Sequence, residues 1–93
     1  MVKEQEQIDV LEKTEVQKQW FLVIHNDDVN DFNYVIHLLI SVCGLDIIRA
    51  EQCTLISDNK GKCDVKKGSF AKMKDLKYKL IDAGLGATVE AVE

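Results

Sequence analysis

Three acceptor-bearing side chains, Asn26, Asp27 and Asp28, follow one another directly after a dense apolar run at residues 20–24. An amphipathic pattern begins soon afterwards, near Asp31. Asn and Asp at such a junction often bond their own backbone and close a turn. Converging carboxylate and amide oxygens can instead hold a cation. The residue types alone leave both roles open.

The cation best suited to such a turn is an ammonium group. It has three hydrogen-bond donors and no acceptor, so its site needs several oxygen atoms that converge on one point. Charge-assisted bonds of this kind are short and stronger than neutral ones. Phe32, Tyr34 and Val35 follow the turn and could form an apolar wall beside it. A charged rim with an apolar floor would suit the N-terminus of a peptide that begins with a bulky residue.

The chain offers little for catalysis. A nucleophile activated by a base needs Ser or Cys next to a base such as His, and only His25 and His37 are present. The five glycines are dispersed, so no phosphate-binding loop is formed. Consecutive acidic residues also lack the alternate spacing of a Ca²⁺ loop. We expect no enzyme activity, no metal and no cofactor.

The three cysteines, Cys43, Cys53 and Cys63, stand ten residues apart without a C-x-x-C pair. This spacing predicts neither a zinc site nor a disulfide framework. The first 19 residues lack the apolar core of a signal peptide, and no stretch is long enough to cross a bilayer. We therefore expect reduced thiols in a cytoplasmic protein.

Length and charge bound the remaining possibilities. Ninety-three residues predict one small domain. The net charge of −4 argues against nucleic acid, which calls for a clustered basic face, and is common for solubility. Residues 1–19 carry three lysines against five acidic residues and few apolar ones, so we expect a disordered extension before a core at 20–93. We also expect no membrane partner and a monomer.

The first half of this core predicts one strand and two helices. Continuous apolar residues at 20–24 are typical of a central strand that is covered on both faces. Apolar residues at i, i+3, i+4, i+7 and i+8 from Val35 predict a helix that ends at Gly44. Asp46 is a suitable N-cap for a second helix. We expect this helix to end before the turn-forming sequence at residues 57–59.

The second half predicts two strands around a third helix. Apolar and polar residues alternate after Gly61, which predicts a strand with one wet face. Ser69 is a suitable N-cap for the third helix, and Gly84 a suitable stop. Residues 87–91 alternate again. The order β-α-α-β-α-β predicts an α+β domain, with three helices on one face of a three-stranded antiparallel sheet.

Four motifs accompany this element order, and together they resemble one family. They are Ile24-His25-Asn26-Asp27-Asp28-Val29-Asn30, Val42-Cys43-Gly44-Leu45, Ala50-Glu51-Gln52-Cys53, and Lys60-Gly61-Lys62-Cys63-Asp64-Val65-Lys66. The domain resembles the ClpS family of adaptor proteins from Trp20 to Val89 or beyond. Members of this family bind proteins with a destabilising N-terminal residue, an N-degron. They deliver these proteins to an ATP-driven Clp unfoldase and its protease without catalytic activity of their own.

The resemblance implies a substrate-binding pocket and a role for the extension. Asn26 and Asp27 correspond to family residues that hold the substrate α-amino group. The family's flexible N-terminal extension is implicated in engaging the unfoldase, which implies the same for residues 1–19. The implied pocket mouth, gate and apolar wall comprise Asp28, Asn30, Phe32 (in the place of a gating methionine), Val35 and Leu39.

Two positions depart from the family pattern. Ser57-Asp58 replaces a common Val-His pair whose histidine helps to bind the α-amino group. A carboxylate at Asp58 still supplies an acceptor for an ammonium group, with a different reach. Thr54 stands where the family usually has methionine, so the pocket would be more polar or differently shaped.

Two other functions stay open at this point. A ClpS-like domain could modulate the Clp ATPase without binding N-degrons, which the change at Asp58 motivates. Alternatively, the C-terminal domain of the ribosomal stalk protein has the same element order. This chain lacks the lysine- and glycine-rich helix of that domain, and the acidic turn would have no role in it.

Overall fold

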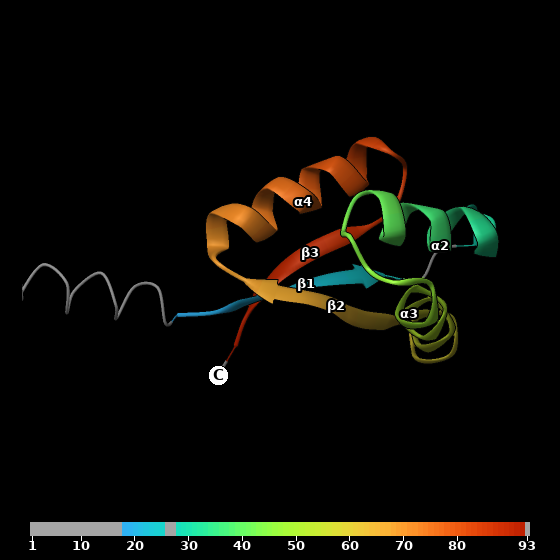
Figure 1. The fold of residues 1–93 in the computed structure, drawn as a ribbon, viewed down its shortest axis with the longest axis horizontal. Coiled ribbons are helices and arrows are strands. Elements are labelled where there is room, and N and C mark those ends of the chain that lie inside the picture. Colours follow the sequence, from blue (N-terminus) through green and yellow to red (C-terminus); the bar gives the residue numbers. More distant parts are fainter. Residues whose placement is uncertain (1–17, 26–27, 93) are drawn as a thin grey trace, which may run out of the picture.

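The computed structural model describes residues 18–25 and 28–92. The elements are β1 (Trp20–His25), α2 (Phe32–Ser41), α3 (Ile47–Lys60), β2 (Lys62–Gly68), α4 (Phe70–Asp82) and β3 (Ala87–Ala91) (Figure 1). The predicted order β-α-α-β-α-β is therefore confirmed. The expected extension lies outside the described residues, except for Lys18 and Gln19.

The sheet is antiparallel, with the strand order β2-β1-β3. The apolar strand β1 is central, as its continuous hydrophobicity predicts. Leu22 pairs with Lys66 and Val23 with Asp64, so Val65 is an extra residue that forms a β-bulge in β2. The side chain of Val65 is almost fully buried in the core.

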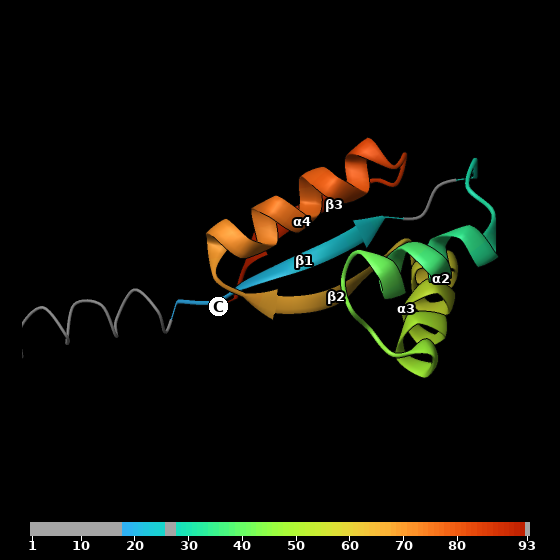
Figure 2. The same cartoon turned by 45° about the horizontal axis from the view of Figure 1, so that its top comes forward.

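The three helices cover one face of this sheet (Figures 1 and 2). Helix α4 packs across β1 and β3, α3 packs against β2, and α2 packs against α3. Leu22 and Ile24 point into the single core that these helices enclose. Val23 points to the opposite face, beside Asp64 and Glu90. The helices thus lie on one face of the sheet, as predicted. Val23 on the other face is only 3% exposed, as expected for a strand that is covered on both faces.

Side chains cap the N-terminus of each helix. Asp46 Oδ1 accepts a 2.8 Å hydrogen bond from the Arg49 backbone N–H, and Ser69 Oγ accepts one of 3.2 Å from Lys72 N–H. These two caps were predicted. Asp31 caps α2 in the same way, through a 3.1 Å bond from the Asn33 N–H. Each cap satisfies a backbone donor that the helix leaves without an internal partner.

Helix α3 is longer than predicted. It continues to Lys60 and ends at Gly61, whose φ of 95° is left-handed and whose N–H bonds to the Ser57 carbonyl oxygen. The expectation that it ends before residues 57–59 is wrong. Burial of Ser57 on the core-facing stripe, together with the glycine stop, overrides the turn preference of Ser, Asp and Asn. Ser57 and Asp58 therefore lie on a helix rather than in a loop.

The three cysteines come together in the core as free thiols. Cys53 on α3 lies near Cys63 on β2, and the Cys63 thiol donates to the Asp64 backbone carbonyl oxygen at 3.4 Å. Burial raises the pKa of Cys43 to about 11 and that of Cys63 to about 12. Such thiols stay protonated near neutral pH and are poor nucleophiles. Within residues 18–25 and 28–92, no cluster of His, Cys, Asp and Glu is arranged to hold a metal.

Across the same described residues, no helix combines the length and apolar character needed to cross a membrane.

Candidate functional site

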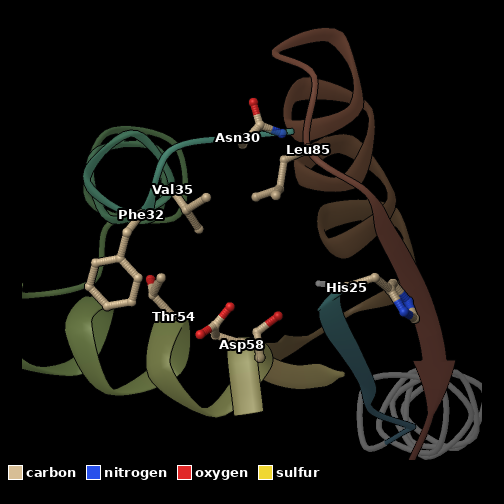
Figure 3. Close-up of a pocket in the computed structure, with 8 residues that line it drawn as sticks. His25, Asn30, Phe32, Val35, Thr54, Asp58 and Leu85 are labelled. Atoms are coloured by element: carbon tan, nitrogen blue, oxygen red, sulfur yellow. The ribbon is translucent and has the colours of Figure 1, made fainter. Parts of the chain in front are cut away.

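A cavity of about 70 Å³ lies between the C-terminal end of α3, the start of α2 and the connection from α4 to β3 (Figure 3). Roughly 10–15 Å³ is enough for one water molecule, so the cavity can admit a group of several atoms. It is lined by His25, Asn30, Phe32, Val35, Thr54, Ser57, Asp58 and Leu85.

One wall of the cavity is rich in oxygen atoms and comes from α3. Thr54 donates its hydroxyl proton to the Ala50 carbonyl oxygen at 2.7 Å, so towards the cavity it can only accept. Ser57 is 5% exposed, and Asp58, one position on, is exposed. Neither the Ser57 hydroxyl nor the Asp58 carboxylate has a side-chain hydrogen bond to any residue that the structure describes. Both can therefore accept from a ligand.

The opposite wall is apolar. Val35 projects from α2 and Leu85 from the α4–β3 connection, both towards the space that the Asp58 carboxylate also faces (Figure 3). Both side chains are buried. Phe32 lies at the edge and is 39% exposed. The cavity thus combines an acceptor-rich side with an apolar side, the arrangement suited to a ligand with one cationic and one aliphatic part.

Hydrogen bonds to backbone carbonyls hold these walls in place. Asn30 Nδ2 donates to the Gly84 carbonyl oxygen at 2.7 Å, and Tyr34 Oη donates to that of Ala83 at 2.7 Å. The His25 backbone N–H bonds to the Gly86 carbonyl oxygen at 3.0 Å. These contacts fix the residues before and after Leu85. They hold the α4–β3 connection against the end of β1 and the start of α2.

His25 lines the cavity at the end of β1, but its ring turns towards β3 (Figure 3). Its Nε2 lies 2.8 Å from Thr88 Oγ1. The imidazole ring therefore contacts Thr88 on β3 rather than the interior of the cavity. The oxygen atoms of Thr54, Ser57 and Asp58 on α3 remain as polar groups that face the cavity. The other sequence histidine, His37, is exposed on α2, as expected for a solvated helix position.

The structure brings six of the ten predicted site residues together: Asn30, Phe32, Val35, Thr54, Ser57 and Asp58. Asp28 is exposed and does not line the cavity. Leu39, expected in the pocket wall, is instead fully buried in the core, on the side of α2 that faces the other elements. Asn26 and Asp27 lie outside the described residues.

Two lining residues were not predicted. His25 has a sequence signal, because it stands directly before the acidic turn. Leu85 was missed because nothing near it in sequence marks a site; it lies 27 residues after Asp58. Its only local signal is its position after the helix-stopping Gly84.

Comparison with known proteins identifies the family of the chain. The sequence matches the family described as "ATP-dependent Clp protease adaptor protein ClpS" over residues 15–88. It is 32% identical over 86 residues to the ATP-dependent Clp protease adapter protein ClpS of Nocardia farcinica, covering 88% of this chain and 81% of that protein.

The fold is similar to that of Agrobacterium tumefaciens ClpS2 bound to L-phenylalaninamide, with a TM-score of 0.77 and 17% sequence identity. This match covers 81% of the present chain and 98% of that one. At this identity the match establishes the fold. Together with the sequence match over most of the chain, it shows that the chain belongs to the ClpS family of Clp protease adaptor proteins.

Proposed function

We propose that this ClpS-family adaptor binds the free N-terminus of substrate proteins in the cavity between α2, α3 and the α4–β3 connection. It then delivers them to a Clp AAA+ unfoldase for degradation. The carrying observation is the pairing of available acceptors at Ser57 and Asp58 with the apolar surface of Val35 and Leu85 in one cavity. A peptide N-terminus presents the complementary groups, an α-ammonium and a first side chain.

The α-ammonium requires converging acceptors. Asp58 supplies a carboxylate on α3, and we assign Asn26 and Asp27 to the same role from the sequence. Hydrogen bonds to charged groups contribute about 1.5–3 kcal/mol each, and less where solvent screens them, as at the exposed Asp58. Asp28 and Phe32 would lie at the mouth of the site.

A similar protein supports this assignment. The Agrobacterium tumefaciens ClpS2 structure, which shares the fold, is described as bound to L-phenylalaninamide. An amino-acid amide has a free α-amine, a side chain and an amide, and is therefore a minimal mimic of a peptide's first residue. The proposed ligand of the present cavity has the same three parts.

A fluorescence-polarisation panel tests the proposal. Peptides would differ only in their first residue, with Phe, Leu, Trp, Tyr, Ala, Lys, Arg and norleucine compared, each with a free and an acetylated N-terminus. We expect at least one free-amine peptide to bind and its acetylated form to lose most of that affinity. Equal and negligible binding across the whole panel would refute N-terminus recognition.

A second function is favoured by one observation. Asp58 stands where the resemblance expects a histidine, so this adaptor could modulate the Clp ATPase without selecting N-termini. Co-purification with a Clp ATPase together with a negative peptide panel would establish that role. The ribosomal-stalk alternative loses its support because the chain belongs to the ClpS family.

A further inference from the structure

We infer that the cavity selects a first residue with a cationic side chain, lysine or arginine, in preference to a large aromatic one. This inference rests on the proposed function and names its substrate class. It follows from the negative charge of Asp58, the available hydroxyl of Ser57, the place of both residues at the C-terminal end of α3, and the apolar wall of the cavity.

The charge that the described lining residues bring to the cavity is negative. Asp58 contributes a carboxylate, and among the described residues that line the cavity there is no lysine or arginine. No described residue forms a salt bridge with Asp58; the two ion pairs among the described residues, Lys62–Glu90 and Lys79–Asp75, lie elsewhere. A cation that enters the cavity therefore meets a carboxylate that no described lysine or arginine already occupies.

Ser57 provides an independent observation. Ser57 is 5% exposed and lines the cavity, and its hydroxyl has no hydrogen-bond partner among the described residues. Because no buried side-chain oxygen or nitrogen atom of the described residues lacks a partner, this hydroxyl is open to the cavity rather than sealed in the core, and it is available to a ligand. An ammonium or guanidinium group has only donors, which match the lone pairs of Ser57 and Asp58.

The position of these groups on α3 strengthens the preference. Both stand in the last turn of a 14-residue helix, where the helix dipole presents partial negative charge. An aspartate at that end is electrostatically unfavourable for the helix itself. A bound cation would reverse this penalty, since it interacts favourably with both the carboxylate and the helix terminus. Breaking a local rule in this way is typical of a functional position.

The size and the apolar wall suit a slender chain. A cavity of about 70 Å³ can admit a row of methylene groups. The stem of lysine or arginine can pack along Val35 and Leu85 while its charged head reaches the oxygen atoms of α3. A carboxylate has two oxygens, so Asp58 can accept from this head with one and from the α-ammonium with the other.

Lysine and norleucine N-termini give the sharpest test, because their side chains share the four-carbon stem and differ by the ammonium group. We expect the lysine peptide to bind about tenfold or more tighter than the norleucine peptide, with a ratio that falls as salt is added. Arginine should behave like lysine, and phenylalanine should bind more weakly than either.

Two variants locate the origin of the preference. Asp58→Asn preserves the shape and removes the charge, and should reduce the lysine-to-norleucine ratio to about threefold or less. Asp64→Asn makes the same change in net charge on the opposite face of the sheet and should leave the ratio unchanged. Asp58→Asn is expected to fold normally, since it removes an unfavourable charge from the helix end, and circular dichroism would check this.

The outcomes separate the two levels of the proposal. Norleucine or phenylalanine binding as tightly as lysine, with dependence on a free amine, would overturn the cationic class and leave N-terminus recognition standing. An unchanged lysine preference in Asp58→Asn would overturn the role of this carboxylate. Absence of binding by every peptide, acetylated or free, would overturn the proposed function itself.

Discussion

Tyr34 Oη donates a 2.7 Å hydrogen bond to the Ala83 backbone carbonyl oxygen, across 49 positions of sequence. The bond joins the first turn of α2 to the end of α4. Asn30 makes a parallel contact with the next residue, Gly84. Leu85 follows immediately and forms part of the cavity wall. Tyr34 is therefore a positioning residue. It does not line the cavity itself, but it holds Leu85, which does, in place.

Tyr34→Phe removes this hydrogen bond and little else. We expect a loss of about 0.5–1.5 kcal/mol in the free energy of unfolding, measured by urea denaturation. Peptide affinity should fall as well, because Leu85 is less firmly held. Tyr78→Phe is the matched control: Tyr78 is 52% exposed on α4, and no described residue accepts a hydrogen bond from its hydroxyl. Equal behaviour of the two variants would contradict the positioning role of Tyr34.

The backbone conformation of Gly84 allows a second, independent test of the α4–β3 connection. Its φ of 96° is left-handed, and an added Cβ would meet only Asn30 Oδ1, at 3.8 Å. Gly84→Ala should therefore lower the free energy of unfolding by about 1–2 kcal/mol through backbone strain rather than through a clash. Gly86→Ala is the control, because Gly86 lacks a positive φ and its added Cβ would make an ordinary 3.7 Å contact with His25. Comparable losses in the two urea curves would contradict this origin.

The buried thiols predict a loss of stability at high pH. Burial raises the pKa of Cys43 from 9.0 to about 11, so the unfolded chain releases this proton at lower pH than the folded one. The contribution of the protonated Cys43 thiol to the free energy of unfolding is therefore fully present below pH 9.0, and it is lost as pH rises towards about 11. Urea unfolding across this window should show a shallower decline for Cys43→Ala than for the wild type. Parallel declines would mean that other groups cause the loss.

Local signals in the sequence predicted most of the fold. Asp46 and Ser69 cap helices where expected, because an N-cap acts on a backbone donor only two or three residues away. The end of α3 was missed because the turn preference of residues 57–59 is local, whereas the burial that keeps Ser57 helical comes from tertiary packing.

The candidate site was only partly predictable, for a related reason. Asn30, Phe32 and Val35 follow the acidic turn closely. The α3 positions Thr54, Ser57 and Asp58 are reached by comparison with the family pattern, from which they depart. Leu85 reaches the cavity through contacts that span about fifty residues, which no local pattern records. Leu39 shares the apolar stripe of Val35, and the stripe alone does not say which of its members faces a cavity and which faces the core.

Leu39 and Val35 therefore give the last prediction, which separates packing from binding. Leu39 is fully buried in the core and does not line the cavity. Leu39→Ala should cost about 2–5 kcal/mol in the free energy of unfolding, a large share of the roughly 5–15 kcal/mol typical of a small domain. Variant protein that remains folded should bind N-terminal peptides with nearly unchanged affinity.

Val35→Ala should show the opposite result, with a smaller loss of stability and a larger loss of peptide affinity than Leu39→Ala. Val35 faces the cavity, so its truncation enlarges a space already open to solvent and costs less stability than a sealed core cavity would. It removes part of the apolar wall, so peptides with aliphatic or long-stemmed first residues should bind more weakly. Urea denaturation and fluorescence polarisation on both variants measure the two effects separately. A stronger binding defect in Leu39→Ala than in Val35→Ala would place the peptide site on another face of α2.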